Sequence, residues 1–302
     1  MKVLISDKIA DSAIDLLKKN NIDFDYNPEI SPEELLKAIP NYQALIVRSR
    51  TKVTKEVISK GRKLQIIGRV GTGVDNIDLA LSKQHKILVV NAPDANSQAV
   101  AELTVGLILS LLRHIPRAVS SMREGLWLKK ELVGEELAGK TIGILGYGHI
   151  GKKVESLLEQ FGTKILVVSR KRLDCTLKEL FETADIVTIH LALNKETKGY
   201  VTKHCIEVMK PTAYLINTSR GEIIDEEALY EALKNKKIAG AALDVFWQEP
   251  LPVDSKWRKL DNIILTPHLG ASTKEALKKA SITVIKDVIQ VMQGKKPENQ
   301  VV

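Results

Sequence analysis

Short apolar runs alternate with longer segments of helical periodicity along almost the whole chain. Five runs in the first third are rich in Val, Ile and Leu and are bounded by polar segments, as is typical of buried strands. These runs are residues 2–6, 22–25, 44–47, 64–68 and 87–90. Helical segments separate them, and parallel strands need such crossover connections. The first third is therefore expected to form a doubly wound parallel sheet.

Two helices carry start signals in the sequence. Ser31 is followed by Pro32 and two glutamates, which is typical of an N-cap residue with proline at the first helical position. Ser272 and Glu275 have the spacing of a capping box, which predicts that the last helix covers residues 274–292. This helix is long enough to return from a second domain and complete the first.

The alternation of strands and helices continues in the rest of the chain. A long helix is expected over residues 96–112, because apolar residues recur there at spacings of three and four. Further strand-like runs follow at residues 141–145, 164–168, 186–189, 213–216, 239–243 and 263–265. We therefore expect an α/β chain with two doubly wound parallel-sheet domains, residues 1–95 with 283–302 and residues 96–282.

The segment TIGILGYGHIG joins the expected strand at 141–145 to a glycine-rich turn that opens a helix. Gly146, Gly148 and Gly151 fill the three glycine positions of a dinucleotide fingerprint. Glycines permit the tight turn, the close approach of the backbone to a pyrophosphate and the close packing of helix on strand. The helix N-terminus adds unpaired N–H groups. The second domain is therefore expected to be a Rossmann-type nucleotide domain, inserted in a flavodoxin-like substrate domain.

The end of the next strand is the place where such a fold senses the adenosine ribose. An NAD site has an acidic residue there, whereas this chain has Ser169 followed by Arg170, Lys171 and Arg172. Cationic side chains attract a 2′-phosphate, which an acidic residue would repel. The pattern predicts NADP(H) as the coenzyme, with Ser169, Arg170 and Lys171 among its contacts. NAD(H) is the alternative, because a basic run on a loop is also typical of an ordinary solvated surface.

Composition limits the class of protein. With 302 residues, 44% of them hydrophobic and 27% charged, the chain is typical of globular proteins. No run approaches the roughly 18 apolar residues of a membrane span and the first residues do not resemble a signal peptide, so a cytoplasmic protein that contacts no membrane is expected. Cys175 and Cys205 lack metal-ligand spacing, so no metal is expected. The net charge of +8 suits anionic ligands, but the sequence lacks nucleic-acid-binding motifs.

Polar residues that follow strands of the second sheet are candidates for catalysis, because ligands of open parallel sheets bind beyond the carboxyl ends of the strands. Three such residues are Arg220, Glu249 and His268. Hydride transfer to a 2-keto acid needs a cation for the carboxylate and a group that exchanges the hydroxyl proton. Arginine suits the first task, and histidine beside a carboxylate suits the second. Spacing alone leaves a surface or packing role open for each of them, and five other histidines remain available.

Long motifs distributed over nearly the whole chain carry a family resemblance. In order, they are RVGTGVDNIDL, NAPDANSQAVAELTVGLIL, GILGYGHIG, LINTSRGEIIDEEAL, AGAALDVFWQEP and TPHLGAST. Together they resemble the D-isomer-specific 2-hydroxyacid dehydrogenase family, and most of all its 3-phosphoglycerate dehydrogenase branch. The resemblance implies a homodimeric, NAD(P)-dependent oxidoreductase that acts on 3-phosphoglycerate or 3-phosphohydroxypyruvate in serine biosynthesis.

The resemblance also implies roles for individual residues. Arg220, Glu249 and His268 match the family's catalytic arginine, glutamate and histidine. Coenzyme contacts are implied for Thr72, His149, Ile150, Leu191, Thr218, Ser219, Asp244, Gly270 and Ala271. Substrate contacts are implied for Arg48, Gly71 and Asn96, in addition to Arg220 and His268. Arg69 and Lys129 would add cations for a phosphorylated substrate.

Other functions remain open from the sequence. Ser169 favours an NADPH-dependent glyoxylate or hydroxypyruvate reductase as the alternative enzyme, because NADPH usually drives reduction. A redox-sensing regulator with the same fold would bind coenzyme without chemistry, and the complete set of Arg220, Glu249 and His268 argues against it. The chain ends soon after its last expected helix, so we expect it to lack the C-terminal regulatory domain of longer family members.

Overall fold

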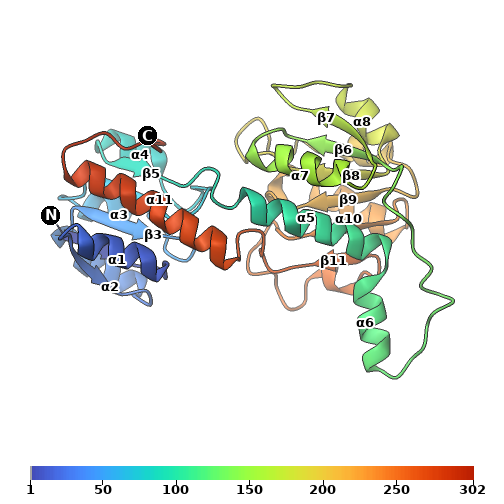
Figure 1. Cartoon of the computed structure of the whole chain (residues 1–302), viewed down its shortest axis with the longest axis horizontal. Helices are drawn as coiled ribbons and strands as arrows, with labels where there is room; N and C mark the ends of the chain where they lie inside the picture. The colour runs from blue at the N-terminus through green and yellow to red at the C-terminus, as the bar shows by residue number, and fades with distance from the viewer. Residues whose placement is uncertain (1) are drawn as a thin grey trace. The chain divides into compact units, whose positions relative to one another are not determined.

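The computed structural model describes residues 2–302, which divide into two compact units. Unit 1 contains the described residues up to Asn96 together with Ala271–Val302, and unit 2 is Ser97–Gly270. Helices and strands alternate within each unit (Figure 1). Each unit is built around one parallel β-sheet. The expected α/β fold with two doubly wound sheets is therefore confirmed.

Unit 1 holds a five-stranded sheet in the order β2-β1-β3-β4-β5. Its strands are β1 (Lys2–Ile5), β2 (Asp23–Tyr26), β3 (Ala44–Val47), β4 (Ile66–Arg69) and β5 (Leu88–Val90). Its helices are α1 (Asp11–Lys19), α2 (Pro32–Ala38), α3 (Lys55–Lys60), α4 (Leu79–Gln84) and α11 (Lys274–Met292), with a short 3-10 helix, η1 (Ile39–Asn41). This strand order is that of the flavodoxin-like fold, as expected.

Both faces of the sheet in unit 1 are buried, because successive side chains of a strand point to opposite sides. Val3 and Ile5 of β1 belong to a buried cluster with apolar side chains of α1 and α11. Leu4, between them, belongs to a second cluster with side chains of α2 and α3. The continuous apolar run at the start of the chain thus fills the core on both sides of the sheet.

Helix caps in unit 1 agree with one sequence signal and correct another. Ser31 and Glu34 form a complete capping box at the start of α2. Helix α11 covers the predicted residues, but its N-cap is Thr273 rather than Ser272. The Thr273 hydroxyl accepts a hydrogen bond from the N–H of Ala276 at 3.1 Å. The expected capping box at Ser272 is therefore wrong by one residue, because a neighbouring hydroxyl residue has the extended backbone that a cap needs.

The boundary between the units differs from the expected position after residue 282. The structure places it between Gly270 and Ala271, so that the whole of α11 lies in unit 1. Packing explains the difference, because Ala280 and Val284 belong to the same buried cluster as the strands of unit 1. Burying one face of the helix along its length keeps its first turns in the same unit as its last.

Unit 2 holds a six-stranded sheet in the order β11-β10-β9-β8-β6-β7. Its strands are β6 (Thr141–Leu145), β7 (Lys164–Val168), β8 (Ile186–Ile189), β9 (Tyr214–Asn217), β10 (Gly240–Leu243) and β11 (Ile263–Leu265). Its helices are α5 (Ser97–Leu112), α6 (Ile115–Arg123), α7 (His149–Glu159), α8 (Leu177–Thr183), α9 (Lys203–Glu207) and α10 (Glu226–Lys234), with 3-10 helices η2 (Gly221–Ile223) and η3 (Lys256–Lys259).

The strand order of unit 2 reverses at β6, which pairs with β7 on one side and with β8 on the other. Such a reversal is the topological switch point, where the loops after neighbouring strands diverge and leave a crevice for a ligand. The expected Rossmann-type description of this unit is confirmed by its parallel sheet and this reversal.

Helix α5 covers the sheet of unit 2 and packs against α7. Its side chains Ala101, Ile108 and Leu112 are buried in the core of the unit. Across residues 2–302, no single helix has the length and apolar character to cross a membrane, and only the bent pair of α5 and α6 passes when its two helices are combined.

Candidate active site

The glycine turn of unit 2 lies at the switch point, between β6 and α7. Gly146 has a φ of +97°, and a Cβ at this residue would lie 2.6 Å from the carbonyl oxygen of His190, which follows β8. At Gly151, a Cβ would lie 2.3 Å from the carbonyl oxygen of Gly146. Only glycine fits both positions. Helix α7 begins at His149 without a side-chain cap from Gly148, so its first N–H groups are suited to bind an anion such as a pyrophosphate.

His190 borders this turn from the end of β8. Its Nε2 lies 2.9 Å from the hydroxyl oxygen of Thr188, and its backbone N–H donates to the carbonyl of Leu145 at 2.7 Å. Burial lowers the pKa of His190 to about 3. The imidazole is therefore neutral near pH 7 and adds no charge at the switch point. Leu191, a predicted coenzyme contact, follows it directly.

The basic run after β7 divides into two parts that the sequence did not distinguish. The Ser169 hydroxyl accepts the N–H of Arg172 at 2.9 Å and donates to the carbonyl of the same residue at 3.0 Å, which closes a tight turn. Arg170 and Lys171 are exposed within this turn, and Arg170 forms an ion pair with the exposed Glu196. The partly exposed Arg172 instead binds side chains of α7 and of the glycine turn.

A buried carboxylate organises the loop after β11. Asp244, directly after β10, is fully buried. Its Oδ1 accepts the hydroxyl of Thr266 at 2.6 Å and the N–H of Leu269 at 2.7 Å, while its Oδ2 accepts the N–H of Gly270 at 2.8 Å. The predicted coenzyme contacts Asp244 and Gly270 are thus in direct contact with each other, and the carboxylate fixes the loop on both sides of His268.

His268 and Glu249 come together at the carboxyl edge of the sheet. Nδ1 of His268 lies 2.7 Å from Oε2 of Glu249, and Oε1 of Glu249 accepts the N–H of Phe246 at 3.0 Å. Burial alone would raise the pKa of Glu249, but hydrogen bonds from His268 and Phe246 and the positive charges of His268 and Arg220 outweigh it. The net effect is a lowered pKa, so Glu249 is a carboxylate at neutral pH.

Arg220 follows β9 on the same edge. The side-chain amide of Asn217 donates to the carbonyl of Arg220 at 2.8 Å, and the Asn217 oxygen accepts the Ser219 hydroxyl at 2.8 Å. The next residue, Gly221, lies so close to the loop after β10 that its Cβ would be 2.3 Å from the carbonyl carbon of Phe246. Arg220 is therefore held beside the residue whose N–H binds Glu249.

The three candidate catalytic residues thus come from loops after β9, β10 and β11 and lie at the same edge of the sheet of unit 2. Glu249 binds His268 directly, and the positive charge of Arg220 contributes to the lowered pKa of Glu249. Of the predicted coenzyme contacts beside them, Thr218 is buried with its hydroxyl oxygen 3.1 Å from that of Thr104. Arg220 and Glu249 are 29 residues apart in the chain, and Glu249 and His268 are 19 apart. They come to the same edge because β9, β10 and β11 are adjacent parallel strands.

The remaining predicted contacts lie in unit 1, where two of them meet. The Thr72 hydroxyl oxygen lies 2.7 Å from Oδ1 of Asn96. Gly71 has a φ of +141°, and the guanidinium of Arg69 occupies the space beside it, 1.6 Å from where a Cβ would lie. Gly71 is therefore required for Arg69 to fold over the backbone. Ala271, the last of these residues, is the first residue of unit 1 after the crossing from unit 2.

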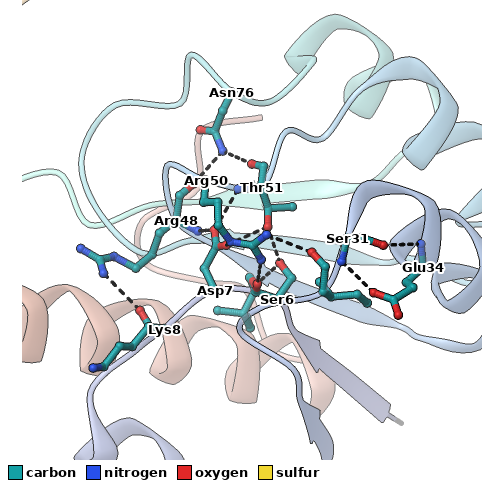
Figure 2. Close-up of polar contacts among 11 residues, drawn as sticks. Ser6, Asp7, Lys8, Ser31, Glu34, Arg48, Arg50, Thr51 and Asn76 are labelled. Carbon is teal, nitrogen blue, oxygen red and sulfur yellow. Dashed lines mark hydrogen bonds and ion pairs between the residues drawn. The ribbon is translucent and has the colours of Figure 1, made fainter. Parts of the chain in front are cut away.

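The two arginines of the RSR segment, residues 48–50 after β3, have different surroundings. Asp7 is 2% exposed and accepts the Thr51 hydroxyl at 2.8 Å, the Arg48 backbone N–H and the Arg50 guanidinium, whose Nε lies 3.0 Å away. Arg50 also donates to the carbonyl of Ile30 at 2.9 Å. Figure 2 shows Arg50 within this cluster, while the guanidinium of Arg48 is directed away from it.

The Arg48 guanidinium donates to the carbonyl of Lys8 at 3.2 Å, at the exposed end of the sheet. The loop beneath it is rigid, because the side-chain amide of Asn76 donates to the carbonyls of Arg48 and Thr51, each at 2.7 Å. Arg48 is therefore presented by a fixed backbone, whereas Arg50 is a structural residue. Lys129 lies in the exposed segment that follows α6 in unit 2.

The sequence did not reveal the residues that support these groups. Asp7 and Asn76 fix the loop of Arg48, and Glu155 binds Arg172, but each lies far from its partner along the chain. Their signal was weak, since a single acidic or amide residue at the end of a strand or inside a helix has many ordinary roles.

Comparison with known proteins relates this geometry to one enzyme family. The sequence profile described as "D-isomer specific 2-hydroxyacid dehydrogenase, NAD binding domain" matches residues 105–270. A D-3-phosphoglycerate dehydrogenase of Methanocaldococcus jannaschii is 43% identical, and the alignment covers 100% of this chain and 59% of the relative. A hydroxypyruvate reductase of Thermotoga maritima is 40% identical over 96% of this chain and 97% of the relative. This chain spans little more than half the length of the phosphoglycerate dehydrogenases that it matches.

A solved structure gives the same result for the fold. The NAD+-bound 3-phosphoglycerate dehydrogenase of Entamoeba histolytica superimposes with a TM-score of 0.87 and 29% sequence identity, covering 100% of this chain and 98% of that chain. The similarity therefore extends over the residues of both units.

Proposed function

We propose that this chain, which belongs to the D-isomer-specific 2-hydroxyacid dehydrogenase family, transfers a hydride between a nicotinamide coenzyme and a D-2-hydroxy acid. The observation that carries the proposal is the 2.7 Å contact between His268 and Glu249 beside Arg220. These groups lie at the same edge of the sheet as the glycine turn. A proton-exchanging imidazole, a fixed cation and an anion-binding helix N-terminus are the parts that this chemistry requires.

In the direction of oxidation, neutral His268 accepts the proton of the substrate hydroxyl through Nε2. Arg220 binds the substrate carboxylate, and Glu249 stabilises the imidazolium that forms. A bound nicotinamide coenzyme would supply the acceptor for the hydride from C2 of the substrate. In the direction of reduction, the imidazolium returns the proton to the carbonyl oxygen. The residues of the glycine turn that fit a pyrophosphate are Gly146, Gly148, His149, Ile150 and Gly151.

We favour 3-phosphoglycerate and 3-phosphohydroxypyruvate as the substrate pair, which would place the enzyme in serine biosynthesis. Two observations support this choice. Curated relatives that cover the whole chain are 3-phosphoglycerate dehydrogenases, and the partly exposed Arg48 guanidinium is a cation suited to a phosphate. Gly71 and Asn96 remain the proposed neighbours of the substrate on the same unit.

Reduction of hydroxypyruvate or glyoxylate is the second candidate. The Thermotoga maritima hydroxypyruvate reductase supports it, because that relative matches this chain over 97% of its own length. The two candidates differ in one chemical requirement, since hydroxypyruvate and glyoxylate carry no phosphate for Arg48 to bind.

For the coenzyme we favour NADP(H) over NAD(H). Ser169 replaces the acidic residue that would bind the ribose hydroxyls and repel a 2′-phosphate. Arg170 and Lys171 are exposed at the tip of the turn that Ser169 closes, where they are suited to meet such a phosphate. NAD(H) remains the alternative, and the ratio of kcat/KM with the two coenzymes tests the choice.

One assay tests the proposed substrate and the proposed coenzyme. The purified protein is mixed with NADPH or NADH and with phosphohydroxypyruvate, hydroxypyruvate or glyoxylate, and the loss of absorbance of the reduced nicotinamide is followed. Turnover highest with phosphohydroxypyruvate supports the first candidate, and turnover highest with the unphosphorylated acids supports the second. Tight coenzyme binding without turnover of any acid would contradict an enzymatic role and favour a regulator.

We also propose that the protein is a homodimer that associates through α6 and the segment after it. Five large apolar side chains are exposed there, namely Ile115, Val119, Met122, Leu126 and Trp127, the last 77% exposed. A concentration of exposed large apolar side chains in one segment is typical of an interface. Sedimentation equilibrium tests the proposal, with Trp127→Ala and Met122→Lys expected to shift the mass toward that of one chain.

A further inference from the structure

Within residues 169–172, Arg172 is the basic residue whose side chain binds a buried carboxylate, that of Glu155, while its second carboxylate partner, Asp174, is 27% exposed. Its Nη1 lies 2.6 Å from Oε1 of Glu155, and its Nε and Nη2 each lie 2.9 Å from an oxygen of Asp174. The guanidinium also packs over the ring of Tyr147, with 5.2 Å between its central carbon and the ring centroid. The guanidinium thus makes four polar contacts, with two carboxylates and one phenol.

These contacts connect three parts of the predicted coenzyme site. Tyr147 lies inside the glycine turn, Glu155 lies in α7 behind that turn, and Asp174 follows the basic run. Asp174 is itself fixed, because its Oδ2 accepts the N–H of Val167 in β7 at 3.0 Å. The Tyr147 hydroxyl donates to the second carboxylate oxygen of Glu155, so that both oxygens of that carboxylate have a partner.

The ion pairs of Arg172 and Arg170 differ in the burial of their glutamate partners. The side chain of Glu155 is 11% exposed, whereas Glu196, the partner of Arg170, is 71% exposed. An exposed ion pair exchanges readily with solvent and contributes little to stability. Removing a guanidinium from a buried carboxylate leaves an uncompensated charge, which is strongly unfavourable. Arg170 and Lys171 are therefore free to meet a ligand, and Arg172 is not.

We propose that Arg172 is a positioning residue that ties the β7 turn to the glycine turn, and that Glu155 and Asp174 withhold its charge from the ribose 2′ position. The proposal rests on the proposed coenzyme function. It deepens that function, because selectivity for a 2′-phosphate then depends on Arg170 and Lys171 alone among the three basic residues. Glu155 and Asp174 become residues that determine specificity without touching the ligand.

The test uses two ligands that carry the adenosine part of the coenzyme and undergo no reaction. Isothermal titration calorimetry measures the Kd of adenosine 2′,5′-bisphosphate and of adenosine 5′-monophosphate for the whole protein. The ratio of the two constants reports recognition of the 2′-phosphate and is independent of catalysis. Thermal unfolding of each variant reports the structural role separately.

Four variants are expected to differ in their effect on the preference for the 2′-phosphate. Lys171→Ala and Arg170→Ala each lower the preference for the 2′-phosphate, by about tenfold for a charge-assisted contact, and leave the Tm unchanged. Arg172→Ala lowers the Tm and weakens both ligands to the same extent, so that their ratio is preserved. The double variant Glu155→Gln with Asp174→Asn removes the charges that hold Arg172 and raises the preference for the 2′-phosphate.

Two results would overturn the inference. One is a loss of 2′-phosphate preference in Arg172→Ala as large as that in Lys171→Ala. The other is an unchanged preference in the double variant, which decides the question even where Arg172→Ala does not fold. Failure of both ligands to bind the unmodified protein would instead overturn the proposed coenzyme function, and the inference with it.

Discussion

Nδ1 of His268 lies 2.7 Å from Oε2 of Glu249, although the two side chains come from loops after different strands. The backbone of His268, whose φ is +52°, is also fixed, because its N–H donates to the carbonyl of Asp244 at 2.9 Å. A carboxylate at Nδ1 favours the tautomer that carries its proton there. Nε2 is then the nitrogen that exchanges a proton with a substrate.

Replacing His268 tests this assignment. His268→Ala removes the proton acceptor and is expected to lower kcat by roughly 10² to 10⁴, the range typical of a general acid or base. Coenzyme affinity should change little, because the glycine turn is untouched. His204→Ala, in the exposed part of α9, is the matched control and should keep its full activity. An ordinary kcat in His268→Ala would remove the proposed role.

Glu249 gives a prediction with a definite pH dependence. Its pKa is lowered below 4.5 in the folded protein, since the bonds from His268 and Phe246 outweigh burial. A lowered carboxyl pKa stabilises the fold above pH 4.5, and this stabilisation is lost as the pH falls through the folded value. Glu249→Gln should therefore show a smaller decrease in Tm between pH 6 and pH 4 than the unmodified protein. Equal decreases, measured by calorimetry, would contradict the assignment.

The buried His190 leads to a second prediction, on how the free energy of unfolding depends on pH. The pKa of His190 is about 3 in the folded protein and 6.5 when the side chain is exposed. Between these two pH values, His190 binds a proton in the unfolded chain but not in the folded protein. The free energy of unfolding should therefore decrease as the pH falls below 6.5, by at most about 2 kcal/mol between pH 7 and pH 5 from this group. Urea titrations at both pH values measure it. His190→Gln should lose this component, and an unchanged pH dependence in that variant would refute the prediction.

The two arginines of the RSR segment should respond differently to substitution. Arg48→Ala removes a partly exposed guanidinium and is expected to raise KM for phosphohydroxypyruvate at least tenfold, with the Tm unchanged. Arg50→Ala leaves the buried Asp7 without its cation and should lower the Tm. Kinetics and thermal unfolding of both variants make the comparison. Unchanged turnover of the phosphorylated acid in Arg48→Ala, with faster turnover of smaller keto acids, would contradict the phosphoglycerate proposal.

The fold was predictable because its signals are local. The strands β3, β6, β7, β8 and β11 have the bounds that their apolar runs predict. The glycine turn was equally clear, because its three glycines have a local spacing in the sequence, although the contact that requires Gly146 comes from His190 after β8. The domain boundary was misplaced, since the first turns of α11 carry no sequence signal that separates one core from another.

The candidate site shows the same division. The sequence by itself determined the elements, the glycine turn and the set of residue types after each strand, because short-range periodicity and backbone conformation depend on neighbouring residues. Only the tertiary structure decided that Glu249 binds His268, that Asp7 binds Arg50 and that Glu155 binds Arg172. Each of these pairs joins residues that are far apart in the chain, and the charge of a side chain does not reveal which partner the packed sheet will bring to it.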